Sequence, residues 1–314
     1  MLFSSSTYNS ENEEIKAPIL EDKGISLYIK REDKIHDDVS GNKFRKLKYN
    51  FLEAKKLGVK KILTFGGAYS NHIAATAAAG QLENIPTVGI IRGDELSKDI
   101  DKTLSENETL RFATAQGMEL QFISRAAYRN KNEESFIKKL RSTFGDIYVI
   151  PEGGTNELAI KGCMEILTEQ DYEFDIICCA VGTGGTITGI INSSNNNQTI
   201  LGFPALKGNF LNMEIKKMTS KKNWKLINDY HFGGYGKIHQ DEINFINQFT
   251  KNHAIPLDPI YTGKMMYGIF DMIRKGMFSK NTRILAIHTG GLQGIKGMNK
   301  KLEKKKLPLI ITTA

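Results

Sequence analysis

Short apolar runs alternate with helical stretches along most of this chain, and no other sequence feature limits the possible fold as strongly. Residues 61–65, 87–91 and 176–181 are apolar runs of strand length, whereas 73–82, 134–141 and 159–168 read as helices. This β-α-β succession predicts an α/β fold with parallel sheets and helices on both faces. Ligands of such folds bind beyond the carboxyl ends of strands. The polar and glycine-rich clusters that follow the predicted strands are therefore the candidate binding loops.

A lysine lies at the start of a helix that follows an early strand. Residues 25–30 alternate with the strand period, and apolar residues recur at helical spacing after residue 42, so a helix begins near Asn42 or Lys43. The positive field of a helix N-terminus lowers the cost of deprotonating Lys43. A neutral amine can form a Schiff base with an aldehyde. The alternative is a solvated lysine that caps an amphipathic helix.

The second cluster, residues 65–72, joins a predicted strand to a predicted helix. Its glycines let backbone amides approach an anion, and Ser70 and Asn71 add donors beside the helix N-terminus, as a carboxylate ligand requires. The alternative to a binding role is that these side chains only cap the helix. Capping needs only one of the two, which favours binding.

The third cluster, residues 182–186, has the sequence Gly-Thr-Gly-Gly-Thr and follows the predicted strand 176–181. Its successive amides can form a concave anion nest, to which two threonine hydroxyls contribute, so it predicts a phosphate site. No Gly-Lys-Ser/Thr ending follows, and the glycine spacing does not match the dinucleotide fingerprint. A tight turn without a ligand is the alternative.

Two further clusters, residues 257–264 and 284–291, end apolar runs in hydroxyls and glycine, as loops that line sites do. Either cluster could instead be structural. We interpret His288, next to a predicted buried strand, as a hydrogen-bonded core histidine rather than a catalytic base.

Charge and cysteine content exclude several classes of function. The net charge of +8 comes from scattered lysines with one dense run at 300–306, and aromatic residues do not interleave with them as nucleic-acid binding requires. Cys163, Cys178 and Cys179 match neither a disulfide framework nor a zinc site, so we expect buried thiols and no metal. No apolar run reaches the ~20 residues of a membrane helix. We expect a cytoplasmic protein without nucleic-acid or membrane partners.

In this order, the five clusters resemble the pyridoxal-phosphate enzymes of fold type II. The motifs GNKFRKL (41–47), SNH (70–72) and DPIYTGK (258–264) are similar to those of one branch, which contains 1-aminocyclopropane-1-carboxylate deaminase and D-cysteine desulfhydrase. The similarity covers residues 27–291, most of the chain.

The resemblance implies a tryptophan synthase β-like fold with two parallel or mixed sheets and helices on both faces. A large cofactor-binding domain would comprise residues 1–48 and 146–314, and a smaller α/β domain would be inserted at 49–145. Members of the family are commonly homodimers.

The resemblance also implies a role for each matching residue. Lys43 would carry pyridoxal 5'-phosphate and act with Tyr261 and Ser70 in catalysis, and Thr262 would face the pyridine nitrogen. The residues implied for cofactor binding are Asn42, Lys43, Asn71, Gly182, Thr183, Gly184, Gly185, Thr186, Thr262 and Thr289. Those implied for binding a small amino-acid substrate are Ser70, Asn71, His72, Tyr235 and Tyr261.

Three positions separate the two activities of this branch. The deaminases typically have Gln, Glu and Leu where this chain has His72, Thr262 and Thr289, all of the desulfhydrase type. A carboxylate keeps the ring nitrogen protonated and makes the ring a strong electron sink, whereas a hydroxyl stabilises that proton far less. Expelling a thiolate needs a weaker sink than opening a cyclopropane. The chain departs from the family at Tyr69, at Ala74-Ala75 and in the segment 92–101.

The resemblance therefore implies a lyase that converts D-cysteine to pyruvate, ammonia and hydrogen sulfide by β-elimination. The nearest alternative is 1-aminocyclopropane-1-carboxylate deaminase, which opens its substrate to 2-oxobutanoate and ammonia. More distant alternatives are a dehydratase or cysteine synthase for L-amino acids and a non-catalytic phosphate-binding protein.

Overall fold

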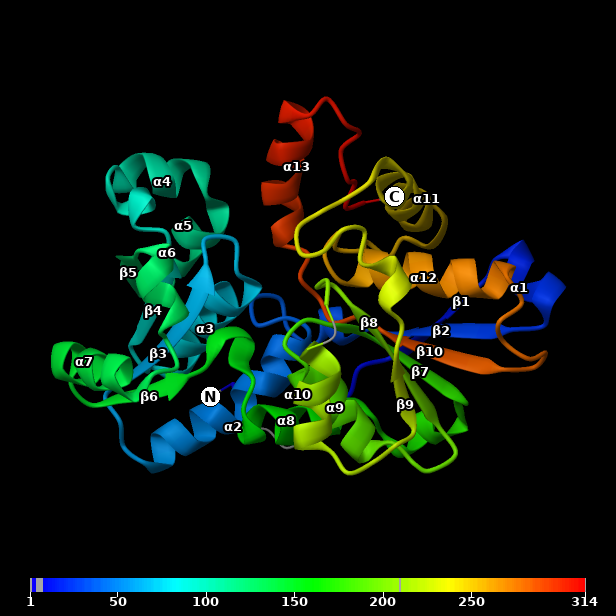
Figure 1. The fold of residues 1–314 in the computed structure, drawn as a ribbon, viewed down its shortest axis with the longest axis horizontal. Helices are drawn as coiled ribbons and strands as arrows, with labels where there is room; N and C mark the ends of the chain where they lie inside the picture. The colour runs from blue at the N-terminus through cyan, green and yellow to red at the C-terminus, as the bar shows by residue number, and fades with distance from the viewer. Residues whose placement is uncertain (1, 4–7, 209, 314) are drawn as a thin grey trace.

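The computed structural model describes residues 2–3, 8–208 and 210–313, which form two lobes, each built around one β-sheet (Figure 1). The larger sheet has the strand order β1-β2-β10-β7-β8-β9 and the smaller sheet the order β5-β4-β3-β6. All neighbouring strands are parallel except β1 and β2. The predicted α/β fold, with one mixed and one parallel sheet, is confirmed. The strands are β1 (Asn12–Ile15), β2 (Ser26–Lys30), β3 (Lys61–Gly67), β4 (Thr87–Arg92), β5 (Glu119–Ile123), β6 (Ile147–Ile150), β7 (Ile176–Val181), β8 (Thr199–Pro204), β9 (Trp224–Leu226) and β10 (Arg283–Ile287).

Helices cover both faces of the six-stranded sheet. Cys178 and Ala286 contribute to the core that includes α11, α12 and α13, whereas Cys179 and Leu285 contribute to the core that includes α8, α9 and α10. Burial on both faces explains the continuous apolar runs of these strands. The helices are α1 (Pro18–Lys23), α2 (Asn42–Lys56), α3 (Asn71–Glu83), α4 (Ile100–Glu106), α5 (Glu108–Ala115), α6 (Arg125–Arg129), α7 (Glu134–Phe144), α8 (Glu157–Cys163), α9 (Gly185–Ser193), α10 (Phe210–Met218), α11 (Gln240–His253), α12 (Thr262–Arg274) and α13 (Gly294–Lys304).

The four-stranded sheet is covered in the same way. Leu63 and Ile90 pack with residues of α6 and α7, whereas Ile91 packs with residues of α3 and α5. The fourth strand of this sheet, β6, lies just outside the range 49–145 that was predicted for the inserted domain. The domain boundaries themselves stay a prediction.

Helix α2 connects the two lobes. Phe44, Leu47 and Phe51 on this helix share a buried cluster with residues of α3. In the first turn of α2, the Arg45 guanidinium donates to the carboxylate of Glu32 at 2.8 Å, and both side chains are buried. A buried, hydrogen-bonded ion pair tolerates little displacement, because either charge alone would be costly to bury. The first turn of α2 is therefore held in a defined position.

Several local predictions can be compared with the structure. The three cysteines are buried free thiols, as expected. The helix predicted over 159–168 was too long, because α8 ends at Cys163 and a short 3₁₀ helix, η4 (Met164–Ile166), follows it. None of the helices in the described part of the chain is long and apolar enough to span a membrane.

Candidate active site

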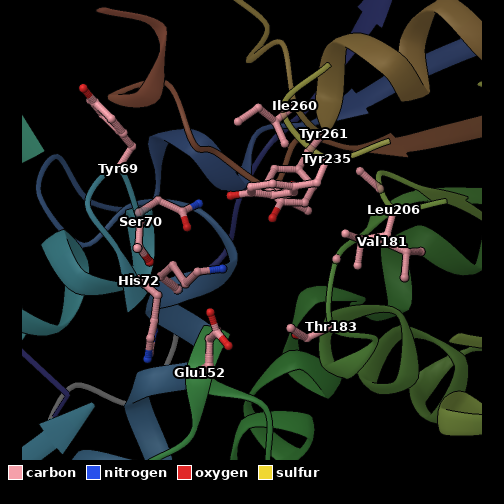
Figure 2. Close-up of a pocket in the computed structure, with 18 of the residues that line it drawn as sticks. Tyr69, Ser70, His72, Glu152, Val181, Thr183, Leu206, Tyr235, Ile260 and Tyr261 are labelled. Carbon is pink, nitrogen blue, oxygen red and sulfur yellow. The ribbon is translucent and has the colours of Figure 1, made fainter. Parts of the chain in front are cut away.

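A cavity of about 910 Å³ lies between the two lobes, and its lining includes residues at or just beyond the carboxyl ends of strands in both sheets. Figure 2 shows Tyr69, Ser70 and His72 on one side of the cavity and Tyr261 and Thr183 on the other. Most of the predicted site residues line this cavity: Asn42, Lys43, Ser70, Asn71, His72, Gly182, Thr183, Gly184, Thr186, Tyr235, Tyr261 and Thr289. Gly185 and Thr262 do not line it.

The turn before α2 delivers Lys43 to the cavity. Gly41 has a φ of 64°, and a Cβ atom at this position would lie 2.1 Å from the carbonyl oxygen of Thr289. Only glycine fits there, since both the backbone conformation and the close approach exclude a side chain. The Asn42 amide nitrogen donates to the same Thr289 carbonyl at 3.2 Å. The strand end at β10 thus fixes the position of the lysine.

The Lys43 amine is a strong candidate nucleophile. Its Nζ donates to Asn42 Oδ1 at 3.0 Å, and the side chain is buried. Burial, reinforced by the charge of Lys46, lowers the pKa of Lys43 from its usual 10.5 to about 7. The main cause is therefore burial rather than the helix field invoked from the sequence. A substantial fraction of this amine is neutral near neutral pH.

The glycine loop between β7 and α9 forms the opposite wall. Gly184, at the N-terminus of α9, has a φ of 90°, which favours glycine. Asn42 Nδ2 donates to Thr186 Oγ1 at 2.9 Å and ties this helix to the first turn of α2. Gly185 faces Thr155 instead of the cavity. The loop places backbone amides and Thr183 beside the cavity, as an anion site requires.

Lys46 is a site residue that the sequence interpretation did not single out. Its buried Nζ donates to Gly153 O at 2.9 Å, to Thr155 Oγ1 at 3.0 Å and to Thr183 Oγ1 at 3.4 Å. Within residues 2–3, 8–208 and 210–313, it has no carboxylate partner within 4.0 Å. A buried cation surrounded by neutral oxygens favours a bound anion. Its spacing of three residues from Lys43 on one helix could have indicated a shared face.

Ser70 and Asn71 begin helix α3 at the wall formed by the smaller lobe. Ser70 Oγ accepts the backbone N–H of Ile73 at 3.4 Å, so the capping role considered for this residue is present. Ser70 and Asn71 both line the cavity as well. Capping therefore leaves the Asn71 amide, the first helical amides and the remaining capacity of the Ser70 hydroxyl for a carboxylate ligand.

His72 is a neutral, buried side chain at the base of this wall. Thr64 Oγ1 donates to Ile150 O at 2.9 Å and lies 2.8 Å from His72 Nε2, so it accepts the Nε2 proton. His72 Nδ1 has no hydrogen-bond partner among the described residues. Burial and the charges of Lys43 and Lys46 hold the pKa of His72 well below its usual range. The ring therefore offers an acceptor and no positive charge.

Two tyrosines face each other on the larger lobe. The rings of Tyr235 and Tyr261 meet edge to face, with centroids 6.2 Å apart. Burial, with the neighbouring Tyr235 and the charge of Asp258, raises the pKa of Tyr261 well above its usual range. Tyr261 consequently stays protonated and can donate a proton or a hydrogen bond, but it is not a base.

Asp258 organises the turn that carries Tyr261. Its carboxylate accepts the backbone N–H groups of Ile260 and Tyr261 at 2.9 Å and that of Thr262 at 2.8 Å. The Thr262 hydroxyl donates to Asp258 Oδ1 at 2.7 Å and accepts the Asp258 backbone N–H at 2.9 Å. The Thr262 side chain is thus engaged within the turn, and its predicted role at a ring nitrogen stays a prediction.

Other residues at strand ends also reach the cavity. Arg92 ends β4 and Glu152 follows β6, and both line the cavity. The rule that places ligands at strand ends could have identified them, because each directly follows an apolar run. His288, by contrast, is buried, with Nε2 2.7 Å from Pro256 O and Nδ1 accepting the Gly290 N–H at 3.3 Å. It is a hydrogen-bonded core residue, as interpreted from the sequence.

The residues around the cavity fit pyridoxal phosphate. Lys43 offers an amine that is partly neutral for a Schiff base, and the buried ammonium of Lys46 lies beside the glycine loop, where a phosphate would complete its surroundings. The polar side chains of Ser70 and Asn71 remain for a carboxylate on the opposite wall. The donor set thus accounts for the reactive end and the anionic end of such a cofactor.

Known proteins resemble this chain over most of its length. A bifunctional D-cysteine desulfhydrase/1-aminocyclopropane-1-carboxylate deaminase of Arabidopsis thaliana is 31% identical, over 87% of this chain and 74% of its own. A Pyrococcus horikoshii protein named "Putative 1-aminocyclopropane-1-carboxylate deaminase" is 32% identical, over 86% of each chain. The crystal structure of a homologue of that deaminase superposes with a TM-score of 0.81 at 28% identity, covering 95% of this chain and 94% of its own.

The family model described as "Pyridoxal-phosphate dependent enzyme" matches residues 11–290, which include every predicted site residue. The cofactor expected from the lysine and the glycine loop is therefore that of the family. The chain belongs to the family of pyridoxal-phosphate dependent enzymes, within the group related to 1-aminocyclopropane-1-carboxylate deaminase and D-cysteine desulfhydrase.

Proposed function

We propose that this enzyme is a lyase that removes the β-substituent of a small D-amino acid, with D-cysteine as the reference substrate and pyruvate, ammonia and hydrogen sulfide as products. The residue that carries the proposal is Thr262. The resemblance places it at the ring nitrogen, where the deaminases have a carboxylate, and in the structure its hydroxyl is hydrogen-bonded to Asp258 and does not line the cavity. A hydroxyl stabilises a protonated ring nitrogen less than a carboxylate does. Such a site suits the departure of a thiolate, which needs a weaker electron sink.

The side chains of the cavity supply the remaining functions. When bound, the cofactor stabilises the negative charge that develops at the α-carbon. Ser70 and Asn71 bind the substrate carboxylate at the N-terminus of α3. Lys43 takes the α-proton, a role for which a pKa of about 7 suits an amine. Tyr261, which stays protonated, orients the β-substituent or donates a proton to it.

The second candidate activity is the opening of 1-aminocyclopropane-1-carboxylate to 2-oxobutanoate and ammonia. The names of the relatives favour it, since the Pyrococcus protein is named for this reaction alone and the Arabidopsis enzyme for both. The same Lys43 and Tyr261 could serve it. Thr262 weighs against it through the argument from the electron sink, and Thr289 is a second residue of the desulfhydrase type. The homodimer expected from the resemblance remains a proposal.

The test is an assay of the cofactor-loaded enzyme with D-cysteine, L-cysteine and 1-aminocyclopropane-1-carboxylate side by side. We expect pyruvate from D-cysteine and no 2-oxobutanoate from the cyclopropane. Lys43→Ala controls for non-enzymatic release of sulfide and should yield neither product. Turnover of the cyclopropane at a rate comparable with D-cysteine would refute the argument from Thr262.

A further inference from the structure

The mouth of the cavity is lined mainly by cations. They come from both lobes: Arg92 at the end of β4, Arg125 on α6, Lys237 in the loop before α11, and Lys301 and Lys305 at the end of α13. The acids that line the cavity are Glu95 and Glu152. A cavity whose walls carry an excess of one charge raises the local concentration of ligands of the opposite charge.

Both acids are already paired with cations: Glu95 with Arg125 of the mouth itself, and Glu152 with Lys131. Arg125 Nη2 donates to Glu95 Oε1 at 2.5 Å, and Lys131 Nζ lies 3.2 Å from Glu152 Oε2. Arg92, by contrast, makes no side-chain hydrogen bond and no ion pair with any residue in the described ranges. A guanidinium with five unused donors is a ready partner for a carboxylate or a phosphate.

The structure holds Arg92 beside the loop that leads to Ser70. Its Cζ lies over the ring of Tyr128, a buried residue, at 5.5 Å from the ring centroid, within the range of a cation–π contact. Its Nη2 lies 3.4 Å from the position that a Cβ of Gly67 would occupy. Burial raises the pKa of Tyr235 on the opposite lobe, and the positive charge of Arg92 opposes this rise.

Helix α13 brings two lysines to the same side of the opening. Lys296 pairs with Glu108 at 3.2 Å, and Lys300 Nζ donates to Glu106 O at 2.7 Å, which holds α13 against α4 and α5. Figure 1 shows α13 above the space between the two lobes. Lys301 Nζ then lies 5.5 Å from the ring centroid of Tyr69, the residue before Ser70.

We propose that the preferred substrate is a small amino acid whose β-substituent ends in a second acidic group, a carboxylate or a phosphate, and that Arg92 binds this group. The inference rests on the proposed β-elimination and specifies its substrate class. The substrate's own carboxylate is assigned to Ser70 and Asn71, and the cofactor phosphate to Lys46 and the glycine loop. Arg92 is thus left to bind a group at the far end of the substrate. Lys301 and Lys305 attract the acidic substrate to the opening of the cavity.

The second acidic group at the end of the β-substituent (the tail of the substrate) does not change the β-elimination itself. The α-proton is removed, the bond from Cβ to sulfur or oxygen breaks, and the leaving group departs with the electron pair. With one water consumed, S-carboxymethyl-D-cysteine gives pyruvate, ammonia and mercaptoacetate, and O-phospho-D-serine gives pyruvate, ammonia and inorganic phosphate. No oxidant or reductant is needed.

A matched pair of substrates tests the proposal. S-Carboxymethyl-D-cysteine and its neutral analogue S-carbamoylmethyl-D-cysteine have nearly the same size and differ by one charge. We expect the wild-type holoenzyme to prefer the acid in kcat/KM, and Arg92→Gln to lose about 10- to 100-fold for the acid alone, as expected for a charge-assisted hydrogen bond. Arg129→Gln, which removes an exposed arginine from the same lobe outside the cavity, is the control. O-Phospho-D-serine shows whether the tail is a phosphate instead.

The outcomes separate this inference from the proposed function. Equal losses for acid and amide in Arg92→Gln would mean that Arg92 binds the common α-carboxylate, and the inference would fall. Equal kcat/KM for acid and amide in the wild type would also overturn it. Absence of pyruvate from D-cysteine and from all three tailed substrates would instead refute the β-elimination. In that case the Arg92 site can still be tested by measuring the binding of D-glutamate and D-glutamine to the holoenzyme by calorimetry. If Arg92 binds the second acidic group, D-glutamate binds more tightly than D-glutamine, and Arg92→Gln removes this difference.

Discussion

Replacing Lys43 with methionine should stabilise the cofactor-free chain at low pH. Folding lowers the pKa of Lys43 from 10.5 to about 7, so the folded state holds its proton less tightly than the unfolded state. Between these two pH values the unfolded chain binds more protons, and the free energy of unfolding rises with pH. Below about pH 7 the wild type carries the whole cost of the buried charge, and methionine removes that cost.

The magnitude follows from the pKa difference. Since one pKa unit corresponds to about 1.4 kcal/mol, the fall from 10.5 to about 7 corresponds to a cost of up to about 5 kcal/mol at pH 6. By about pH 9 roughly 3 kcal/mol of that cost has disappeared, because the folded chain no longer holds the proton. The lost hydrogen bond to Asn42 costs the variant about 1 kcal/mol at either pH.

Urea unfolding of the cofactor-free wild type and of Lys43→Met, followed by circular dichroism at pH 6 and pH 9, measures this difference. We expect the variant to be the more stable protein at pH 6 and its advantage to shrink by roughly 3 kcal/mol at pH 9. Lys102→Met, which removes an exposed lysine from α4, controls for the substitution itself. The same advantage at both pH values, or a less stable variant at pH 6, would refute the reasoning.

Three further predictions concern the same site. Lys46→Gln should weaken the affinity of the apoenzyme for pyridoxal phosphate about 10- to 100-fold, because a buried cation beside the glycine loop is lost. A cofactor titration followed by absorbance measures this affinity. Gly41→Ala should abolish stable folding or lower the melting temperature strongly, since its Cβ would lie 2.1 Å from Thr289 O. Differential scanning fluorimetry measures this effect. Gly58→Ala is the control that separates the clash from the backbone strain, because Gly58 also has a positive φ but no neighbour within 4 Å. The rate of cofactor incorporation should fall as the pH drops below about 7, because the neutral Lys43 amine is the reacting form; a flat stopped-flow profile between pH 5 and pH 9 would contradict it.

Much of the fold could be predicted from sequence because the strands are buried on both faces. The run 176–181 coincides with β7, and 61–65 and 87–91 lie within β3 and β4. The end of α8 was misplaced for a reason that lies outside the local sequence. A Cβ atom at Gly162 would lie 1.9 Å from the Arg45 carbonyl oxygen, so α8 packs directly on the backbone of α2 at this point. This packing is a contact between distant segments, which local helical propensity does not contain.

The residues of the candidate site also fall into those that a local sequence signal reveals and those that depend on contacts between distant segments. Lys43 and the glycine loop carry local signals that a sequence displays. Lys46 does not, because the oxygens that it contacts on Gly153, Thr155 and Thr183 lie more than 100 residues away in the chain. The lowered pKa of Lys43 was predicted with the wrong leading cause, since the degree of burial at a helix start depends on the lobe that packs over it.

The position of α13 has a mechanical consequence. This helix continues from the larger lobe, yet Lys296 and Lys300 attach it to Glu108 and Glu106 of the smaller lobe. Hinge opening of the two lobes at this side would have to break both contacts, which lie at the surface. The Lys296–Glu108 contact is a surface ion pair that salt screens, whereas the Lys300 contact is a hydrogen bond to the backbone carbonyl of Glu106. The last long helix of the chain thus bridges the two lobes, and salt weakens only the ion-pair part of this bridge.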